Sequence, residues 1–137
     1  MAIDYGSKRT GVAVTDPMQM IASPLETVPT HGLMDFLASY MQKEKVDVLV
    51  VGEPKQMDAK GSEPLPQIRF FVEAFRKRFN KVPVKWVDER YTSRMAMNAM
   101  VEGGMKKSDR RNRANVDKVS AAIILQTYLE SKNKLSE

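Results

Sequence analysis

After its first methionine the chain reads AIDYGSKRTGVAVT over residues 2–15, and the rest of the architecture can be inferred from this stretch. Two apolar segments flank a polar turn at residues 6–9, which is typical of a β-hairpin. The first segment, Ala2–Tyr5, carries Asp4 among apolar neighbours. A carboxylate is costly to bury without a partner, so Asp4 is the first candidate for a functional residue.

Three later segments extend the hairpin into a larger sheet. A third strand is expected at Ile21–Val28, at an edge or with a bulge because it contains Pro24. The apolar run Val46–Val51 is typical of a strand buried on both faces of a parallel sheet. Alternating apolar residues from Val82 to Trp86 predict a further strand that leads into Asp88-Glu89-Arg90.

Four helices are expected between and after these strands. Their starts share a capping residue or a proline, at Thr30, Pro66, Thr92 or Ser93, and Asn115. The third helix ends at Gly103-Gly104, and the last runs from Val116 to about Leu129. The order β-β-β-α-β-α-β-α-α predicts one α/β domain over residues 1–137, with a mixed sheet and helices on both faces.

The composition restricts the chemistry that is available. Of the 137 residues, 42% are hydrophobic, which suits one domain with a sizeable core. No apolar run reaches the length of a membrane span, and the N-terminus has no signal-peptide pattern, so we expect a soluble, cytoplasmic protein. There is no cysteine and one histidine, His31, which excludes Cys-based zinc sites and clusters of histidines. Catalysis would therefore depend on carboxylates, lysines and arginines.

The net charge of +5 is concentrated near the C-terminal end. Between positions 106 and 118 there are six basic residues and only two acidic ones, Asp109 and Asp117. The basic residues are Lys106, Lys107, Arg110, Arg111, Arg113 and Lys118. This stretch is either a solvated loop or a basic arm that contacts the phosphates of a nucleic acid.

Three acidic positions could converge with Asp4 on one site. Asp88 and Glu89 follow a strand, where open α/β sheets place their functional residues. Asp117 shares a helix face with Ser120 and Ala121, which allow close approach to the sheet. Converging carboxylates need a cation, and ligation by oxygen alone suits Mg²⁺ or Mn²⁺. Two such ions about 4 Å apart can activate a water for phosphodiester hydrolysis.

A purely structural role remains open for each acid taken alone. Asp117 would stabilise the positive end of its helix, and Asp88 or Glu89 would form ion pairs with Arg90. Gly6 and Gly11 match no nucleotide-binding fingerprint. Gly6 either allows a tight turn with its backbone close to a ligand or belongs to an ordinary hairpin turn.

Four segments together resemble the YqgF family, also called RuvX. Residues 2–13 are similar to its opening motif, and Val50-Val51-Gly52-Glu53-Pro54 with Met57-Asp58 is similar to its central strand and loop. Val87-Asp88-Glu89-Arg90 with Thr92 and Ser93 matches its Asp-Glu-Arg motif. Val116-Asp117 with residues 120–126 matches its last helix. The motifs occur in order and span almost the whole chain.

The resemblance implies an RNase H-like fold with strand order 3-2-1-4-5. It also implies a cytoplasmic hydrolase, described as a nuclease that processes the 5′ end of pre-16S ribosomal RNA and also as a Holliday junction resolvase. Asp4, Glu89 and Asp117 would be both the catalytic acids and the metal ligands. Nucleic-acid contacts are expected from Lys8, Arg9 and Arg90, together with the basic residues 106–113. The substrate would be structured RNA or branched DNA, and the protein a monomer or a homodimer.

Three positions depart from the family pattern, and two other classes of function stay open. Glu53 replaces a usual apolar residue and is either a fourth acidic ligand or a surface carboxylate; Ala59 replaces a glycine, and Ser120 replaces an alanine. The opening motif is also similar to the first phosphate loop of the actin and Hsp70 superfamily, but those ATPases need two such domains. A non-catalytic nucleic-acid-binding module for ribosome assembly would have the same basic loop.

Overall fold

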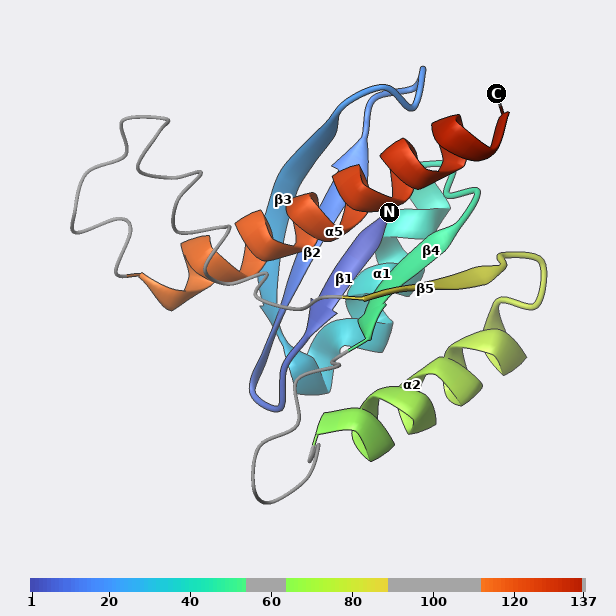
Figure 1. The fold of residues 1–137 in the computed structure, drawn as a ribbon. Helices are drawn as coiled ribbons and strands as arrows, with labels where there is room; N and C mark the ends of the chain where they lie inside the picture. Colours follow the sequence, from blue (N-terminus) through green and yellow to red (C-terminus); the bar gives the residue numbers. More distant parts are fainter. Residues whose placement is uncertain (54–63, 89–111, 137) are drawn as a thin grey trace.

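The computed structural model describes residues 1–53, 64–88 and 112–136. Five strands form one sheet in the order β3-β2-β1-β4-β5 (Figure 1). They are β1 (Ala2–Tyr5), β2 (Arg9–Thr15), β3 (Ala22–Pro29), β4 (Leu49–Glu53) and β5 (Val84–Asp88). Strand β1 lies at the centre, antiparallel to β2 and parallel to β4. The expected strand order 3-2-1-4-5 and the mixed sheet are thus confirmed.

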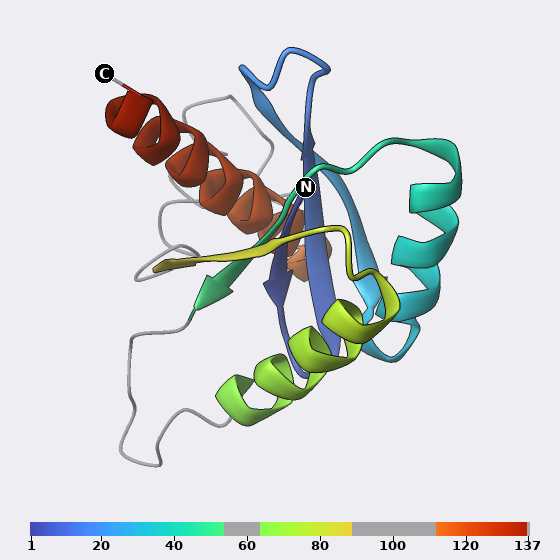
Figure 2. The same ribbon diagram turned by 90° about the vertical axis from the view of Figure 1, so that its right-hand side faces the viewer.

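Helices cover both faces of this sheet. Helix α1 (Leu33–Lys43), which follows the 3₁₀ turn η1 (Thr30–Gly32), lies with α2 (Pro64–Arg78) on one face. Helix α5 (Arg113–Ser136) crosses the other face diagonally, as Figures 1 and 2 show. In the described ranges, no helix combines the length and the apolar character that crossing a bilayer requires.

The alternation of side chains along the strands divides the core in two. Ile3 of β1 is packed in the larger cluster with α1 and α2, which includes Leu37 and Phe75. Ala2, the residue before it, packs against α5 in a cluster that includes Ala121. Odd-numbered residues of β1 therefore face α1 and α2, and even-numbered ones, including Asp4, face α5. Small side chains on the α5 face let the helix lie close to the strands.

Strand β3 shows the irregularity that Pro24 predicts. It forms the edge of the sheet next to β2, and its register shifts where Val12 pairs with Glu26 and Ala13 pairs with Pro24. Leu25 is the extra residue of this bulge. A proline at an edge strand removes no hydrogen bond that a neighbouring strand would need.

The predicted boundaries are less accurate than the predicted elements. Strand β4 begins at Leu49 rather than Val46, and α2 begins at Pro64 rather than Pro66. Thr30 does not cap α1, because it is the first residue of η1 and its hydroxyl bonds to Gly6 instead. The last helix begins at Arg113, not Val116, since Asn112 rather than Asn115 accepts a bond from the first turn. The expected loop 55–63 and the whole of the expected helix from Thr92 or Ser93 to Gly103 lie outside the described residues.

Candidate active site

A row of three paired residues crosses the sheet below the first turns of α5. Thr27 of β3 pairs with Gly11 of β2, and Gly11 pairs with Asp4 of β1. Residues directly opposite each other point to the same face, so all three belong to the α5 face. Asp4 is half-buried at this position, near the carboxyl end of the central strand.

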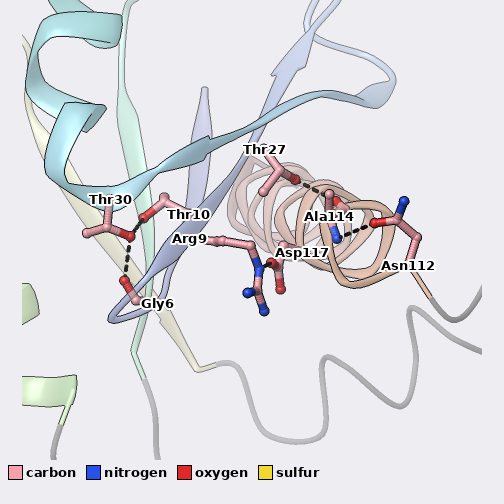
Figure 3. A network of polar contacts seen from close by, with 8 residues as sticks. All are labelled: Gly6, Arg9, Thr10, Thr27, Thr30, Asn112, Ala114 and Asp117. Carbon is pink, nitrogen blue, oxygen red and sulfur yellow. Dashed lines mark hydrogen bonds and ion pairs between the residues drawn. The ribbon is translucent and has the colours of Figure 1, made fainter.

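The first turns of helix α5 run along this row of residues. The Thr27 hydroxyl donates to the carbonyl oxygen of Ala114 (Figure 3). The backbone of Asp117 lies directly over Gly11. A Cβ atom at Gly11 would lie only 2.0 Å from the Asp117 carbonyl oxygen, so only glycine admits the helix here. Three helical residues advance the chain by about 4.5 Å, which is roughly one strand spacing. Asp117 is thereby brought to the strand next to Asp4, on the same face.

The Asp117 side chain is held by an ion pair that the sequence did not reveal. Arg9 Nε donates to Asp117 Oδ2 at 2.9 Å, and the two side chains are 39% and 21% exposed. The two residues are 108 positions apart. Gly11 follows Arg9 by two residues in β2, so the two positions lie on the same, α5-facing side of the strand. This shared face can be predicted from the alternation of side chains along a strand. Nothing in the sequence shows the rotamers that bring the two charges into contact.

The turn between β1 and β2 forms a polar hollow beside this ion pair. The hollow measures about 420 Å³ and is lined by residues 6–9 and Asp117. Lys8 is exposed at its rim, and Arg9 forms its wall toward α5. The two positive side chains outnumber the single carboxylate of Asp117 in this hollow, and this net charge suits an anionic group such as a phosphate.

Thr30 anchors the same turn from the other face. Its hydroxyl donates to the Gly6 carbonyl oxygen at 2.6 Å, and its backbone N–H donates to the Lys8 carbonyl oxygen at 3.0 Å. Because the single hydroxyl proton of Thr30 is used for Gly6, the buried Thr10 hydroxyl donates to Thr30 Oγ1, at 2.9 Å. Sequence reasoning assigned Thr30 to a helix cap and missed this role.

Two further acids lie on the opposite face. Glu53 lines a small hollow with Arg69 and Arg76 of α2, so it does not share the face of Asp4. Val87 packs in the α5-side cluster and Trp86 in the other, which puts Asp88 on the α2 face as well. Glu53 is therefore not a fourth ligand beside Asp4. Asp88 likewise faces away from it.

Several predicted site residues cannot be placed. Glu89, Arg90, Lys106, Lys107, Arg110 and Arg111 lie outside the described residues, and for Arg113 only the helical backbone is described. In the described part of the chain, no three acidic or histidine residues form a group that would hold a metal ion. Asp4 and Asp117 supply two carboxylates on one face, and their hard oxygen atoms fit Mg²⁺ or Mn²⁺. The assignment of Glu89 as the third ligand stays a prediction.

Comparison with known proteins identifies relatives over nearly the full length. A protein from Phocaeicola vulgatus is 57% identical over 132 residues, covering 96% of this chain and 95% of its own. One from Bacteroides thetaiotaomicron is 54% identical over 132 residues, covering 96% of both chains. Each carries the name "Putative pre-16S rRNA nuclease".

The chain is also similar to a solved structure and to a family model. The fowlpox virus resolvase, in complex with its substrate Holliday junction DNA, matches with a TM-score of 0.49 and 14% sequence identity, over 96% of this chain and 99% of its own. The family model described as "RuvX: Holliday junction resolvase" matches residues 1–131. With this match and relatives above 50% identity, the chain belongs to the RuvX family.

Proposed function

We propose that this protein is a metal-dependent nuclease that hydrolyses phosphodiester bonds in the 5′ leader of pre-16S ribosomal RNA. The observation that carries the proposal is the approach of Asp117 to the strand beside Asp4, next to a turn that presents Lys8 and Arg9. The names of the family and of the relatives support a hydrolase that acts on nucleic acids. Such an enzyme would act in the cytoplasm, where ribosomal RNA matures.

In this proposal Asp4, Glu89 and Asp117 hold Mg²⁺ or Mn²⁺, as two ions. The metal supplies Lewis-acid chemistry and an activated water. The protein's own residues do the rest. The turn at residues 6–9 holds a substrate phosphate through Lys8 and Arg9, and the tethered helix α5 keeps Asp117 over Gly11. The basic residues 106–113 hold further phosphates and position the substrate without reading its sequence.

A cleavage assay with matched variants tests the proposal. Wild-type protein is incubated with end-labelled leader RNA in Mg²⁺, in Mn²⁺ or in EDTA. Cleavage is expected only with metal, and Asp4→Asn, Glu89→Gln and Asp117→Asn are expected to lose it. Asp88→Asn is the matched control, because Asp88 lies on the opposite face, and it should still cut. Loss of activity in a folded Asp88→Asn variant, with Glu89→Gln active, would reverse the assignment of these two acids.

The family description favours a second candidate, a Holliday junction resolvase. The same assay should therefore offer a four-way DNA junction beside the RNA. A resolvase makes two symmetric cuts and needs a two-fold dimer, so size-exclusion chromatography gives an independent readout. Symmetric cleavage of the junction by a dimer, with the RNA intact, would replace the RNA proposal. Tight binding of RNA without cleavage in any metal would instead indicate a non-catalytic assembly module.

A further inference from the structure

The carboxylate of Asp117 already has a cationic partner within the chain. Arg9 donates to it through Nε, and this is the contact between the two side chains that Figure 3 marks. An arginine has five N–H donors in a fixed fork, so this contact leaves most of its donors for another acceptor. The hollow lined by residues 6–9 lies beside them.

A metal ion and this guanidinium would compete for the same oxygen. Both are cations, and Asp117 Oδ2 lies 2.9 Å from Arg9 Nε, too close for a metal ion to be inserted between the two atoms. An ion bound to Oδ2 would repel the guanidinium and weaken the hydrogen bond between Arg9 and this carboxylate. The displaced side chain has one nearby place that suits its charge, next to a phosphate in the hollow beside Lys8.

We propose that Arg9 exchanges partners during the reaction cycle: it pairs with Asp117 in the metal-free protein and with a substrate phosphate once metal is bound. This inference rests on the proposed function and deepens it. In the metal-free state Arg9 offsets the charge of Asp117 and limits the repulsion between Asp117 and Asp4. Metal binding frees Arg9 for the substrate, so metal and nucleic acid each increase the affinity for the other, as reciprocal coupling requires.

The size of the effect follows from the exposure of the pair. An ion pair that is partly open to solvent is weak. Because metal must break this pair in wild-type protein, the cost of breaking it lowers the metal affinity of wild type by a factor of about two to five. Removing Arg9 should therefore tighten metal binding by about that factor. If Arg9 only held substrate, removing it would leave the affinity for metal unchanged in the absence of nucleic acid.

The test measures metal affinity without nucleic acid. Mn²⁺ is titrated calorimetrically into wild-type protein, Arg9→Gln and Lys8→Gln. The lysine variant is the matched control, because it removes one positive charge from the adjacent position without touching Asp117. Arg9→Gln is expected to bind Mn²⁺ about two- to fivefold more tightly than Lys8→Gln does.

A second measurement follows the substrate side. Affinity for an RNA hairpin with cleavage-resistant phosphorothioate linkages is measured with and without Mn²⁺. Mn²⁺ should tighten RNA binding to wild-type protein more than to Arg9→Gln. Equal Mn²⁺ affinities of Arg9→Gln and Lys8→Gln, with normal Mn²⁺ binding by wild type, would overturn the exchange and leave the proposed function standing. Absence of Mn²⁺ binding in every variant, wild type included, would overturn both.

Discussion

Two backbones come so close at Gly11 that a side chain at this position would collide with α5. The added Cβ of Gly11→Ala would lie 2.0 Å from the Asp117 carbonyl oxygen and 2.7 Å from the Lys118 nitrogen. Backbone atoms cannot swing aside as the end of a flexible side chain can, so α5 must shift. We expect Gly11→Ala to lower the free energy of unfolding by about 1–3 kcal/mol, as overpacking usually does, and to abolish cleavage.

Gly32→Ala is the control for this substitution, because nothing lies within 4 Å of a Cβ at Gly32. Its free energy of unfolding, measured by urea denaturation, should stay within about 0.5 kcal/mol of wild type. A Gly11→Ala variant with wild-type stability and activity would show that α5 does not depend on this close approach.

Asp16 gives a pH dependence at a single residue. Its carboxylate accepts hydrogen bonds from the backbone N–H groups of Ile21 and Met20, and these bonds lower the pKa of Asp16. A lowered pKa in the folded state stabilises the protein above the unfolded pKa of about 3.9. That contribution is lost as the pH falls through the lower, folded pKa.

The variant Asp16→Asn keeps an acceptor oxygen but cannot titrate. Urea denaturation at pH 7 and at pH 3 should therefore show a smaller loss of stability on acidification for Asp16→Asn than for wild type. Equal losses for the two proteins would mean that the hydrogen bonds of the β2–β3 turn do not contribute to acid sensitivity.

At the scale of elements, the order of the strands was predictable and their ends were not. The motif resemblance implied the strand order, and the apolar segments of β1, β2 and β4 indicated the strands themselves. The placement of α5 follows from its small, buried face around Ala121. Helix ends depend on single hydrogen bonds that several nearby residues could make. Asn112, not Asn115, caps α5, and Thr30 bonds to the β1–β2 turn instead of to α1.

For the candidate site, the face on which a residue lies was predictable, and the contact between two side chains was not. The α5 face of Asp4 follows from strand alternation, whereas the Arg9–Asp117 contact depends on a helix packing across the sheet. Residue types and spacing do not specify such a packing distance. The motif resemblance therefore named Asp4, Asp117 and Arg9 as candidates, with Arg9 as a nucleic-acid contact, but it did not predict the ion pair between Arg9 and Asp117.

The link between η1 and the β1–β2 turn predicts a separable effect on substrate binding. Thr30→Val removes the hydroxyl that donates to Gly6 and leaves the buried Thr10 hydroxyl without its acceptor. We expect a loss of about 1–3 kcal/mol in stability, since a buried polar group is left unsatisfied. The looser turn should raise the KM for RNA several-fold with little change in kcat.

Thr30→Ser keeps the hydroxyl and is the matched control, with stability and KM close to wild type. Steady-state kinetics and urea denaturation measure the two effects. A fall in kcat at unchanged KM would contradict a role for this turn in holding substrate.

Over the whole molecule, the charge distribution predicts how binding responds to salt. Neutralising Lys106 and Lys107 should flatten the dependence of log affinity on log salt by about 0.9 per lost contact on duplex DNA, and by about 0.7 on single strands. Related sequences should be weakened equally, because phosphate contacts do not read bases. Neutralising Lys43 and Lys45 is the control, since they precede β4 at the end of the strands opposite Asp4. Equal slopes in both double variants would indicate that residues 106 and 107 are merely solvated.

The ion pair between Arg9 and Asp117 also bears on the order of events during translation. Its two residues are 108 positions apart, so at about 5–20 residues per second the ribosome adds Asp117 roughly 5–20 seconds after Arg9. Until then the nascent chain can pair β1 with β2 but cannot bring Asp117 to the face of Asp4. With the function proposed above, the protein would stay inactive while its N-terminal half is exposed beside the translating ribosome and its messenger RNA.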